Sequence, residues 1–575
     1  MKYLLCGINA KYIHSNLAVY SLKKYADLRG PESAQIQITE YTINHYVDDI
    51  LRGLYLEKAD VLIFSCYIWN IRYVKELCRE MKKVRPDMPI WVGGPEVTYE
   101  PEDFLKENKA VDLVMIGEGE QVFTDLVSCY EKNQDIRNLR GLVFRDGDSI
   151  INNGFAPVMD LDQVPFVYDD IHLFNHKIMY YETSRGCPFA CTYCLSSVEE
   201  TTRFRSEDLV AVELQKFLDA KVPQVKFVDR TFNCNRDHAM FIWKYIHEHD
   251  NGVTNFHFEI SSDLLDDEEI ALFSKMRVGL IQLEIGLQTT YPPAIASIDR
   301  HMDLDLLFAN VDKVHSFGNI HQHLDLIAGL PFEDFEHFGH SFDDLYRHHP
   351  DQLQLGFLKV LKGTRMKQMA DQYGIVYCSE APYEVLKTND LPYDDVIRLK
   401  GIEELVELYY NSGQYEYTLQ YVVPFFESPF QFFKEFSEDY HDRGLDKANH
   451  NRMEKYQILR HFLLDSGKRM PYLDQVMLYD IYLRENVKSR PDWAPDQTGD
   501  KKQWKELYRS QGNLLFPGKK DYDSKKAANK SHIERFSLDI EAMLEKGVYQ
   551  KKDCRVLFDY TERSPLDHNA RTLVF

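Results

Sequence analysis

The feature that most constrains the fold is a regular alternation of short apolar runs with amphipathic stretches. In the first 145 residues, helices are expected at 17–28 and near 70–84, and apolar runs typical of strands stand at 3–8, 35–41, 60–65, 89–94 and 111–116. Continuous apolar strands that alternate with helices indicate a parallel sheet covered by helices on both faces. Residues 1–145 are therefore predicted to form an open α/β domain.

Small residues stand at the carboxyl ends of three of these strands. Ligands of open parallel sheets bind outside these ends, and small residues let a ligand approach the backbone closely. Any one of the glycine pairs could serve only a tight turn, but three such ends at one edge favour a ligand site. The candidate binding residues are Ser65, Gly93, Gly94, Gly117, Glu118 and Gly119.

Residues 146–176 lose periodicity and carry glycines, prolines and many aspartates, so they are predicted to be a linker. A second series of alternating strands and helices follows this linker. Its strands are expected near 178–183, 225–229, 256–261, 280–287, 321–327 and 352–359. Six strand–helix units predict a partial parallel barrel over residues 177–375. Residues 376–575 are predicted to form a mostly helical domain of unknown role.

Several barrel strands carry polar residues on one face, because every second side chain of a strand points to the same side. His257, Glu259 and Ser261 share one such face. A barrel packed outside by helices turns these groups inward, where polar groups are costly unless they are paired. The lumen is therefore interpreted as a polar reaction chamber, with a self-contained polar network as the alternative. The candidates for substrate binding and proton transfer are Glu259, Glu284, His321 and His323, of which the two last could alternatively bind a metal ion.

Composition excludes several classes of protein. The chain has 575 residues and a net charge of −23, which argues against nucleic-acid binding driven by overall charge. It has no run of 18 apolar residues, so neither a transmembrane helix nor a membrane partner is expected. Ten cysteines in so long a chain do not form a disulfide framework, and we expect a reducing cytoplasm, where clustered cysteines bind metal or catalyse.

Three cysteines form such a cluster directly after the first barrel strand. Cys187, Cys191 and Cys194 are spaced CxxxCxxC. Thiolates are soft ligands suited to iron–sulfur clusters or zinc. Closed structural zinc sites almost always take four ligands, and no fourth cysteine or histidine lies at a typical zinc spacing. A four-iron cluster held by three cysteines would instead leave one iron open to a substrate or cofactor.

This spacing, with Tyr193 as the aromatic residue, resembles the CxxxCx(aromatic)C signature of the radical S-adenosylmethionine (SAM) superfamily. The resemblance implies that the three cysteines ligate a [4Fe–4S] cluster whose open iron chelates SAM. One electron from the cluster would cleave SAM to a 5′-deoxyadenosyl radical, which implies an electron donor such as flavodoxin or ferredoxin. Tyr193 would lie near the adenine.

The resemblance extends to further SAM-binding positions. Asp229 stands where the family usually has a Gly-Gly-Glu-type stretch, and its carboxylate would meet the SAM ammonium group. Ser261 and Gln288 end the third and fourth strands, which are usual places for contacts with the ribose, the carboxylate or the methionyl group. Ile327 and Gly329 belong to a segment similar to the family's adenine-binding segment.

The amino-terminal domain resembles the cobalamin-binding domain fused to many radical SAM enzymes, on the three strand ends named above. The resemblance implies a Rossmann-like fold with cobalamin at those ends. In one subset of cobalamin proteins, a D-x-H-x-x-G loop after the first strand supplies a histidine to cobalt, and only His14 matches that loop here. His14 is a candidate cobalt ligand. The alternatives are a cobalamin without protein histidine, or a hydrogen bond from His14 to substrate or at the domain interface.

Together the resemblances imply a cobalamin-dependent radical SAM enzyme of unknown substrate, with methyl transfer to an unactivated carbon as the expected reaction. A radical rearrangement or cyclisation would use the same cofactors. A non-enzymatic cobalamin or redox sensor is the alternative without catalysis. A tRNA methylthiotransferase would usually show another amino-terminal cysteine cluster, which the scattered cysteines of the first 130 residues do not form.

Overall fold

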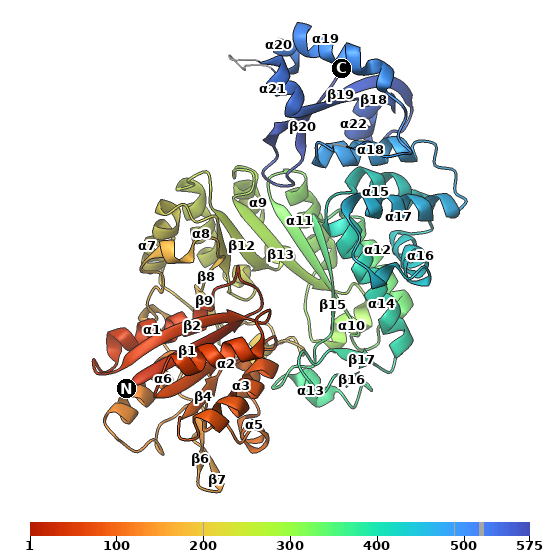
Figure 1. Cartoon of the computed structure of the whole chain (residues 1–575). Coiled ribbons are helices and arrows are strands. Elements are labelled where there is room, and N and C mark those ends of the chain that lie inside the picture. The colour runs from red at the N-terminus through yellow and green to blue at the C-terminus, as the bar shows by residue number, and fades with distance from the viewer. Residues whose placement is uncertain (199–200, 488, 517–522) are drawn as a thin grey trace.

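The computed structural model describes residues 1–198, 201–487, 489–516 and 523–575. Figure 1 shows three regions in chain order, with the amino-terminal sheet in red and orange, a second parallel sheet in yellow and green, and the carboxyl-terminal region in cyan and blue. No helix among the described residues is both long and apolar enough to cross a membrane.

The first sheet has the strand order β2-β1-β3-β4-β5-β6-β7, and its first five strands are parallel. These strands are β1 (Lys2–Asn9), β2 (Gln35–Thr42), β3 (Val61–Ser65), β4 (Ile90–Gly93) and β5 (Leu113–Met115). Apolar residues of α1 (Leu17–Arg29) and α6 (Gly119–Glu131) pack on one face, and those of α2 (Val47–Leu56), α3 (Ile71–Val84) and α5 (Pro101–Glu107) pack on the other. The expected Rossmann-like α/β fold is confirmed.

A hairpin that the sequence pattern did not predict extends this sheet. β6 (Leu142–Asp146) and β7 (Ser149–Asn152) add antiparallel to β5, joined by a turn in which Gly147 has φ +61°. The sheet thus continues past residue 145, where the sequence pattern placed the start of a linker. The strands are short and end in charged or polar residues, so they lack the continuous apolar run that marks the buried strands.

The second sheet has the order β15-β14-β13-β12-β11-β8, all parallel, and its two edge strands do not pair. Its strands are β8 (Met179–Tyr181), β11 (Gln224–Phe227), β12 (Asn255–Ile260), β13 (Ile281–Gln288), β14 (His321–Ala328) and β15 (Gln352–Phe357). Helices α7 (Glu207–Asp219), α8 (Arg236–Glu248), α9 (Asp267–Phe273), α11 (Leu304–His315) and α12 (Phe335–Tyr346) share one apolar core with it. The predicted partial six-stranded barrel is confirmed.

The carboxyl-terminal region is mostly helical, as expected, but it ends in a sheet that was not predicted. The larger helices are α14 (Tyr393–Leu405), α16 (Pro429–Asp442), α17 (Arg452–Asp465) and α18 (Leu473–Arg484). β18 (Ser531–Leu538), β19 (Lys551–Arg563) and β20 (Ala570–Val574) then form an antiparallel sheet, at the top of Figure 1. The sequence did not predict β19 because exposed charged residues stand at both ends of its short apolar centre.

The segment after the barrel ties the two sheets together. Its hairpin, β16 (Val376–Tyr377) and β17 (Val385–Lys387), brings Ala381 and Tyr383 into the apolar core of the first domain. The Tyr383 hydroxyl also donates a hydrogen bond to Glu96, which is buried beside β4. These contacts hold the carboxyl ends of the first sheet against the barrel.

Candidate active site

A cavity of about 890 Å³ lies between the first domain and the barrel. Its walls come from the loops after β1, β3, β4 and β5, from β8, and from the loop that carries the cysteines. Every residue predicted at the strand ends lines it: Ser65, Gly93, Gly94, Gly117, Glu118 and Gly119. The sequence analysis therefore placed these residues at the correct edge of the sheet, and their contact with cobalamin stays a prediction.

Two of the glycines are required by the backbone at this wall. Gly94 has φ +114° and ψ 173°, a conformation that only glycine adopts readily. A Cβ at Gly94 would lie 2.5 Å from the Cys66 carbonyl oxygen. Gly117 has φ +79°. The local backbone thus accounts for glycine at these two positions, and their contact with cobalamin stays a prediction.

His14 also lines the cavity, and the structure gives it a partner that the sequence could not identify. Its Nδ1 lies 2.6 Å from the Tyr180 hydroxyl oxygen on β8, so the contact crosses the domain interface. Burial, with Lys11 and Lys226 nearby, lowers the pKa of His14. The imidazole is therefore neutral near pH 7, and its role toward cobalt stays a prediction.

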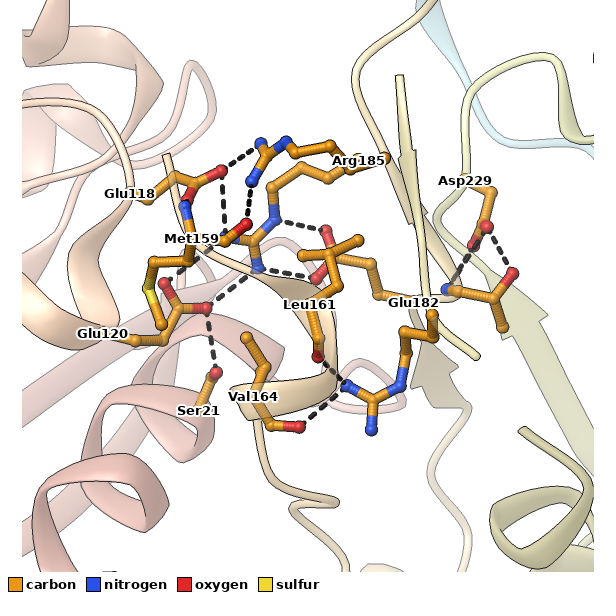
Figure 2. A network of polar contacts seen from close by, with 12 residues as sticks. Ser21, Glu118, Glu120, Met159, Leu161, Val164, Glu182, Arg185 and Asp229 are labelled. Carbon is orange, nitrogen blue, oxygen red and sulfur yellow. Dashed lines mark hydrogen bonds and ion pairs between the residues drawn. The ribbon is translucent and has the colours of Figure 1, made fainter. Parts of the chain in front are cut away.

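Arginines on the barrel side hold carboxylates of the first domain across the cavity wall (Figure 2). Arg185 Nη2 lies 2.9 Å from Glu120 Oε1 and 2.7 Å from Glu182 Oε2. Arg203 pairs with Glu118 and donates to the Met159 carbonyl oxygen at 2.6 Å. Burial alone would raise the pKa of Glu120, but Arg185 outweighs it and lowers that pKa. Sequence reasoning missed this network, because its members are far apart in the chain.

The cysteine loop leaves the barrel at β9 (Ser184–Arg185). Cys187 and Cys191 are buried and Cys194 is half-buried. Burial raises the pKa of the Cys191 thiol, the neighbouring thiols raise it further, and the Arg300 guanidinium opposes both. Three soft donors close enough to interact, beside a fixed cation that favours thiolates, are suited to an iron–sulfur cluster.

Arg300 and Cys234 are two residues near this loop that sequence reasoning missed. Arg300 Nη1 lies 3.9 Å from Cys191 Sγ and 3.5 Å from the Tyr193 hydroxyl oxygen. Burial raises the pKa of Cys234 to about 11, and Cys187 is near enough to contribute to that rise. Neither residue has a recognisable spacing from the triplet, since each reaches it from a different strand end.

The predicted SAM-binding residues are only partly brought together. Tyr193 and Ile327 pack against the same apolar cluster, and their contact with the adenine stays a prediction. The Asp229 carboxylate, by contrast, is fully buried and accepts hydrogen bonds from the Thr183 N–H at 3.0 Å and from the Thr183 hydroxyl at 2.5 Å. Burial raises the pKa of Asp229 to about 6. Its carboxylate orients the end of β8, and a contact with the SAM ammonium group stays a prediction.

The other three predicted positions hold the backbone near the strand ends. Gly329 has φ +87°, and a Cβ there would lie 2.7 Å from Val385 of β17. Gln288 has φ +75°, and the Ser261 hydroxyl donates to Asp263 Oδ1 at 2.6 Å. The positive φ and the close approach of Val385 account for glycine at position 329, and the contacts of all three residues with SAM stay predictions.

The lumen face of the barrel carries a network of ionisable groups in cross-strand register. Glu259 pairs with Glu284, and Glu284 pairs with His323, across β12, β13 and β14. Glu284 Oε2 lies 3.0 Å from both His257 Nε2 and Lys226 Nζ. Burial raises the pKa of Glu284, but these two partners lower it well below its usual range. The expected inward-facing polar surface is present.

His321 and His323 lie in different layers of the lumen, and metal binding by this pair stays a prediction. His323 Nε2 lies 3.0 Å from Asp325 Oδ1 and faces Glu284, whereas His321 belongs to the next layer of the lumen, in register with Gln282. Burial lowers the pKa of His323, but Asp325 outweighs it and the net pKa is raised. Burial lowers the pKa of His321. The two imidazoles therefore have different environments.

Comparison with known proteins agrees with this division. Three family models match successive parts of the chain: "B12 binding domain" over residues 3–127, "Radical SAM superfamily" over 181–345, and "Protein of unknown function (DUF4080)" over 371–558. The structure of the cobalamin-dependent SAM radical enzyme OxsB aligns over 96% of this chain and 82% of its own, with a TM-score of 0.57 and 15% identity. At that identity the likeness concerns the fold.

Two relatives are similar in sequence. An uncharacterized methyltransferase of Pyrococcus horikoshii is 25% identical over 302 residues, which are 50% of this chain and 64% of that protein. The cobalamin-dependent radical SAM methyltransferase TokK of Streptomyces tokunonensis is 23% identical over 399 residues, 62% of this chain and 57% of TokK. The chain thus matches less than two thirds of either relative's length.

The fold and the two matched domains define a radical SAM barrel joined to a B12-binding domain. The chain carries a B12-binding domain and a radical SAM domain, and its cofactors are cobalamin, SAM and a [4Fe–4S] cluster. Radical SAM enzymes generally need a reductant. The glycine-lined cavity and the three clustered thiols suit this set of cofactors.

Proposed function

We propose that this enzyme transfers a methyl group to an unactivated carbon of its substrate. One observation carries the proposal: the strand ends of the B12-binding domain and the start of the cysteine loop line the same cavity. Gly94 and Glu118 contribute to it from one side, and Arg185, Gly186 and Leu195 from the other. Cofactors held by the two domains would therefore face one chamber, and the similarity to TokK supports the same reaction class.

The bound cofactors carry the hard chemistry, with cobalamin as methyl carrier and the SAM–cluster pair as the source of a radical that removes a hydrogen atom. The protein supplies placement. Cys187, Cys191 and Cys194 would hold the cluster, and Tyr193 and Ile327 would pack against the adenine. Asp229, Ser261, Gln288 and Gly329 shape the surrounding strand ends. His14 would lie at the cobalamin, held through Nδ1 by Tyr180.

The polar lumen is proposed as the substrate site. Glu259 is paired with Arg230 at 3.2 Å, and Glu284 is paired with Lys226 at 3.0 Å, so ion pairs hold both carboxylates in place. His321 and His323 differ in the direction of their pKa shifts, so one imidazole is suited to accept a proton and the other to hold one. Flavodoxin or ferredoxin is the proposed electron donor.

The test uses SAM with a deuterated methyl group and the reduced, reconstituted holoenzyme, incubated with a metabolite extract from a strain that lacks the enzyme. A product that is heavier by one labelled methyl group supports methyl transfer. A rearranged or cyclised product without the label would refute it in favour of the alternative radical reaction. Absence of 5′-deoxyadenosine would refute radical chemistry altogether.

A further inference from the structure

Three side chains in the barrel lumen converge on one point, and two of them, Glu284 and His323, also belong to the proposed substrate site. Glu284 on β13 is in register with His323 on β14, and Asp325 lies two residues further along β14 on the same face. Each side chain offers one ligand atom, and these atoms all lie within 4.8 Å of one another. Two neighbouring strands of a rigid sheet fix their positions, since alternate side chains of a strand point to the same face.

Two atoms of this group form a buried ion pair. His323 Nε2 and Asp325 Oδ1 are 3.0 Å apart. No residue outside the pair is hydrogen-bonded to either atom in the part of the chain that the structure describes. The His323 side chain is only 9% exposed. Polar atoms buried in this manner are costly unless a further group satisfies them.

The third side chain is held with one oxygen left open. Glu284 Oε2 takes the contacts with both His257 and Lys226, each at 3.0 Å, and Oε1 has no bond to any residue of the described chain. Hydrogen-bond partners outside a metal site, such as His257 and Lys226 here, commonly orient a metal-binding carboxylate.

We propose that Glu284, His323 and Asp325 bind a divalent first-row metal ion, distinct from the cluster and from cobalt. One imidazole nitrogen and two carboxylate oxygens suit Mn²⁺, Fe²⁺ or Zn²⁺, and they suit Cu⁺ poorly, because Cu⁺ prefers sulfur. Three protein ligands leave open coordination positions toward the lumen, as in catalytic rather than structural sites. The argument for this site uses neither cobalamin nor SAM, although Glu284 and His323 also belong to the proposed substrate site.

The test is a titration of the anaerobic holoenzyme with Mn²⁺, followed by the loss of the free-ion EPR signal. Mn²⁺ is the probe because added iron could not be told from cluster iron. The wild-type protein should bind one Mn²⁺ per chain with saturation. Asp325→Asn and His323→Gln should each weaken this binding at least tenfold. Gln354→Ala, which removes an uncharged side chain in register with Asp325 on β15, should leave it unchanged.

Two controls keep the outcome readable. The cobalamin absorbance and the EPR signal of the reduced cluster in each variant report that the protein is folded and loaded. Cys191→Ala should still bind Mn²⁺, because the site does not involve the cysteine loop. The proposal is overturned if the wild type binds no Mn²⁺, or if Asp325→Asn and His323→Gln bind it as the wild type does. Neither result depends on methyl transfer, which the labelled-SAM assay measures separately.

Discussion

At the scale of single residues, Arg185 connects the cysteine loop of the barrel to the first domain through ion pairs. It stands two residues before Cys187, and its guanidinium lies within ion-pair distance of Glu118, Glu120 and Glu182. Arginine suits this position because its planar fork can contact several carboxylates at once, whereas lysine presents one point charge. The start of the cysteine loop is thereby fixed to the wall of the cavity.

Arg185→Met should therefore destabilise the protein. It leaves buried carboxylates without their cation, and breaking one side of a buried ion pair costs about 3–5 kcal/mol. We expect a lower melting temperature and faster release of cobalamin, measured by calorimetry and by absorbance after dilution. Arg52→Met, at an exposed ion pair, is the control and should change neither. A variant at Arg185 that melts like the wild type would contradict this account of the network.

The cluster assignment gives a second residue-scale prediction. Cys191→Ala should abolish both the cluster absorbance and the reductive formation of 5′-deoxyadenosine, because two thiolates do not hold the cluster. Cys234→Ala is the matched control: it removes a thiol near Cys187 that lies outside the triplet, and it should retain both signals. If Cys234→Ala loses the cluster and Cys191→Ala retains it, Cys234 is a cluster ligand and Cys191 is not.

The third residue-scale prediction concerns pH. Asp480 is fully buried and accepts from the Thr418 N–H at 2.7 Å and from the Thr418 hydroxyl at 2.6 Å, and burial raises its pKa to about 7. The folded state then holds a proton that the unfolded state releases near pH 4. Stability from this group is present below about pH 4 and is lost as pH rises through about 7.

The side chain of Asp480→Asn cannot ionise, so the variant should not lose stability as the pH rises through 7. In the wild type this loss of unfolding free energy is roughly 4 kcal/mol, because each pKa unit corresponds to about 1.4 kcal/mol. The difference in melting temperature between variant and wild type should increase from pH 5 to pH 8. Asp492→Asn, at an exposed aspartate, should show a constant difference over the same range. A constant difference for Asp480→Asn as well would mean that its carboxyl titrates normally.

At the scale of elements, the strand ends of the first sheet could be predicted because their signal is local. Apolar runs that end in serine or glycine identify β3, β4 and β5 and the edge where ligands are expected to bind. The β6–β7 hairpin and the β18–β20 sheet could not be predicted in this way, because short or charged-ended strands become buried only through distant partners. The same limit applies to the site: the cysteine triplet is visible in the sequence, whereas Arg300, Tyr180 and Asp325 reach their partners only in the fold.

Gly94→Ala tests the strand-end backbone directly. It places a side chain at φ +114° and a Cβ 2.5 Å from the Cys66 carbonyl oxygen, so it carries both strain of about 1–3 kcal/mol and a clash. We expect loss of cobalamin binding, measured by equilibrium dialysis with hydroxocobalamin. Gly252→Ala has positive φ but open space around the Cβ, and it should lower stability slightly while cobalamin binding persists. If both variants bind hydroxocobalamin equally well, Gly94 is not required for cobalamin binding.

At the scale of the whole molecule, three regions that differ in family match form one connected structure (Figure 1). The segment that follows the barrel inserts Ala381 and Tyr383 into the core of the first domain, and Lys362 Nζ approaches Glu96 Oε1 at 3.5 Å from the barrel side. These contacts support the wall of the cavity in which both cofactors would meet. A shared chamber is the property on which the methyl-transfer proposal depends.

The most direct measurement of that property is the magnetic interaction between Co(II) of cobalamin and the reduced iron–sulfur cluster. In the holoenzyme, reducing the cluster should broaden and split the cob(II)alamin EPR signal, because the two paramagnets face one cavity. In Cys191→Ala, the cob(II)alamin signal should stay that of the isolated centre. A holoenzyme spectrum that is the plain sum of two independent centres would contradict the account.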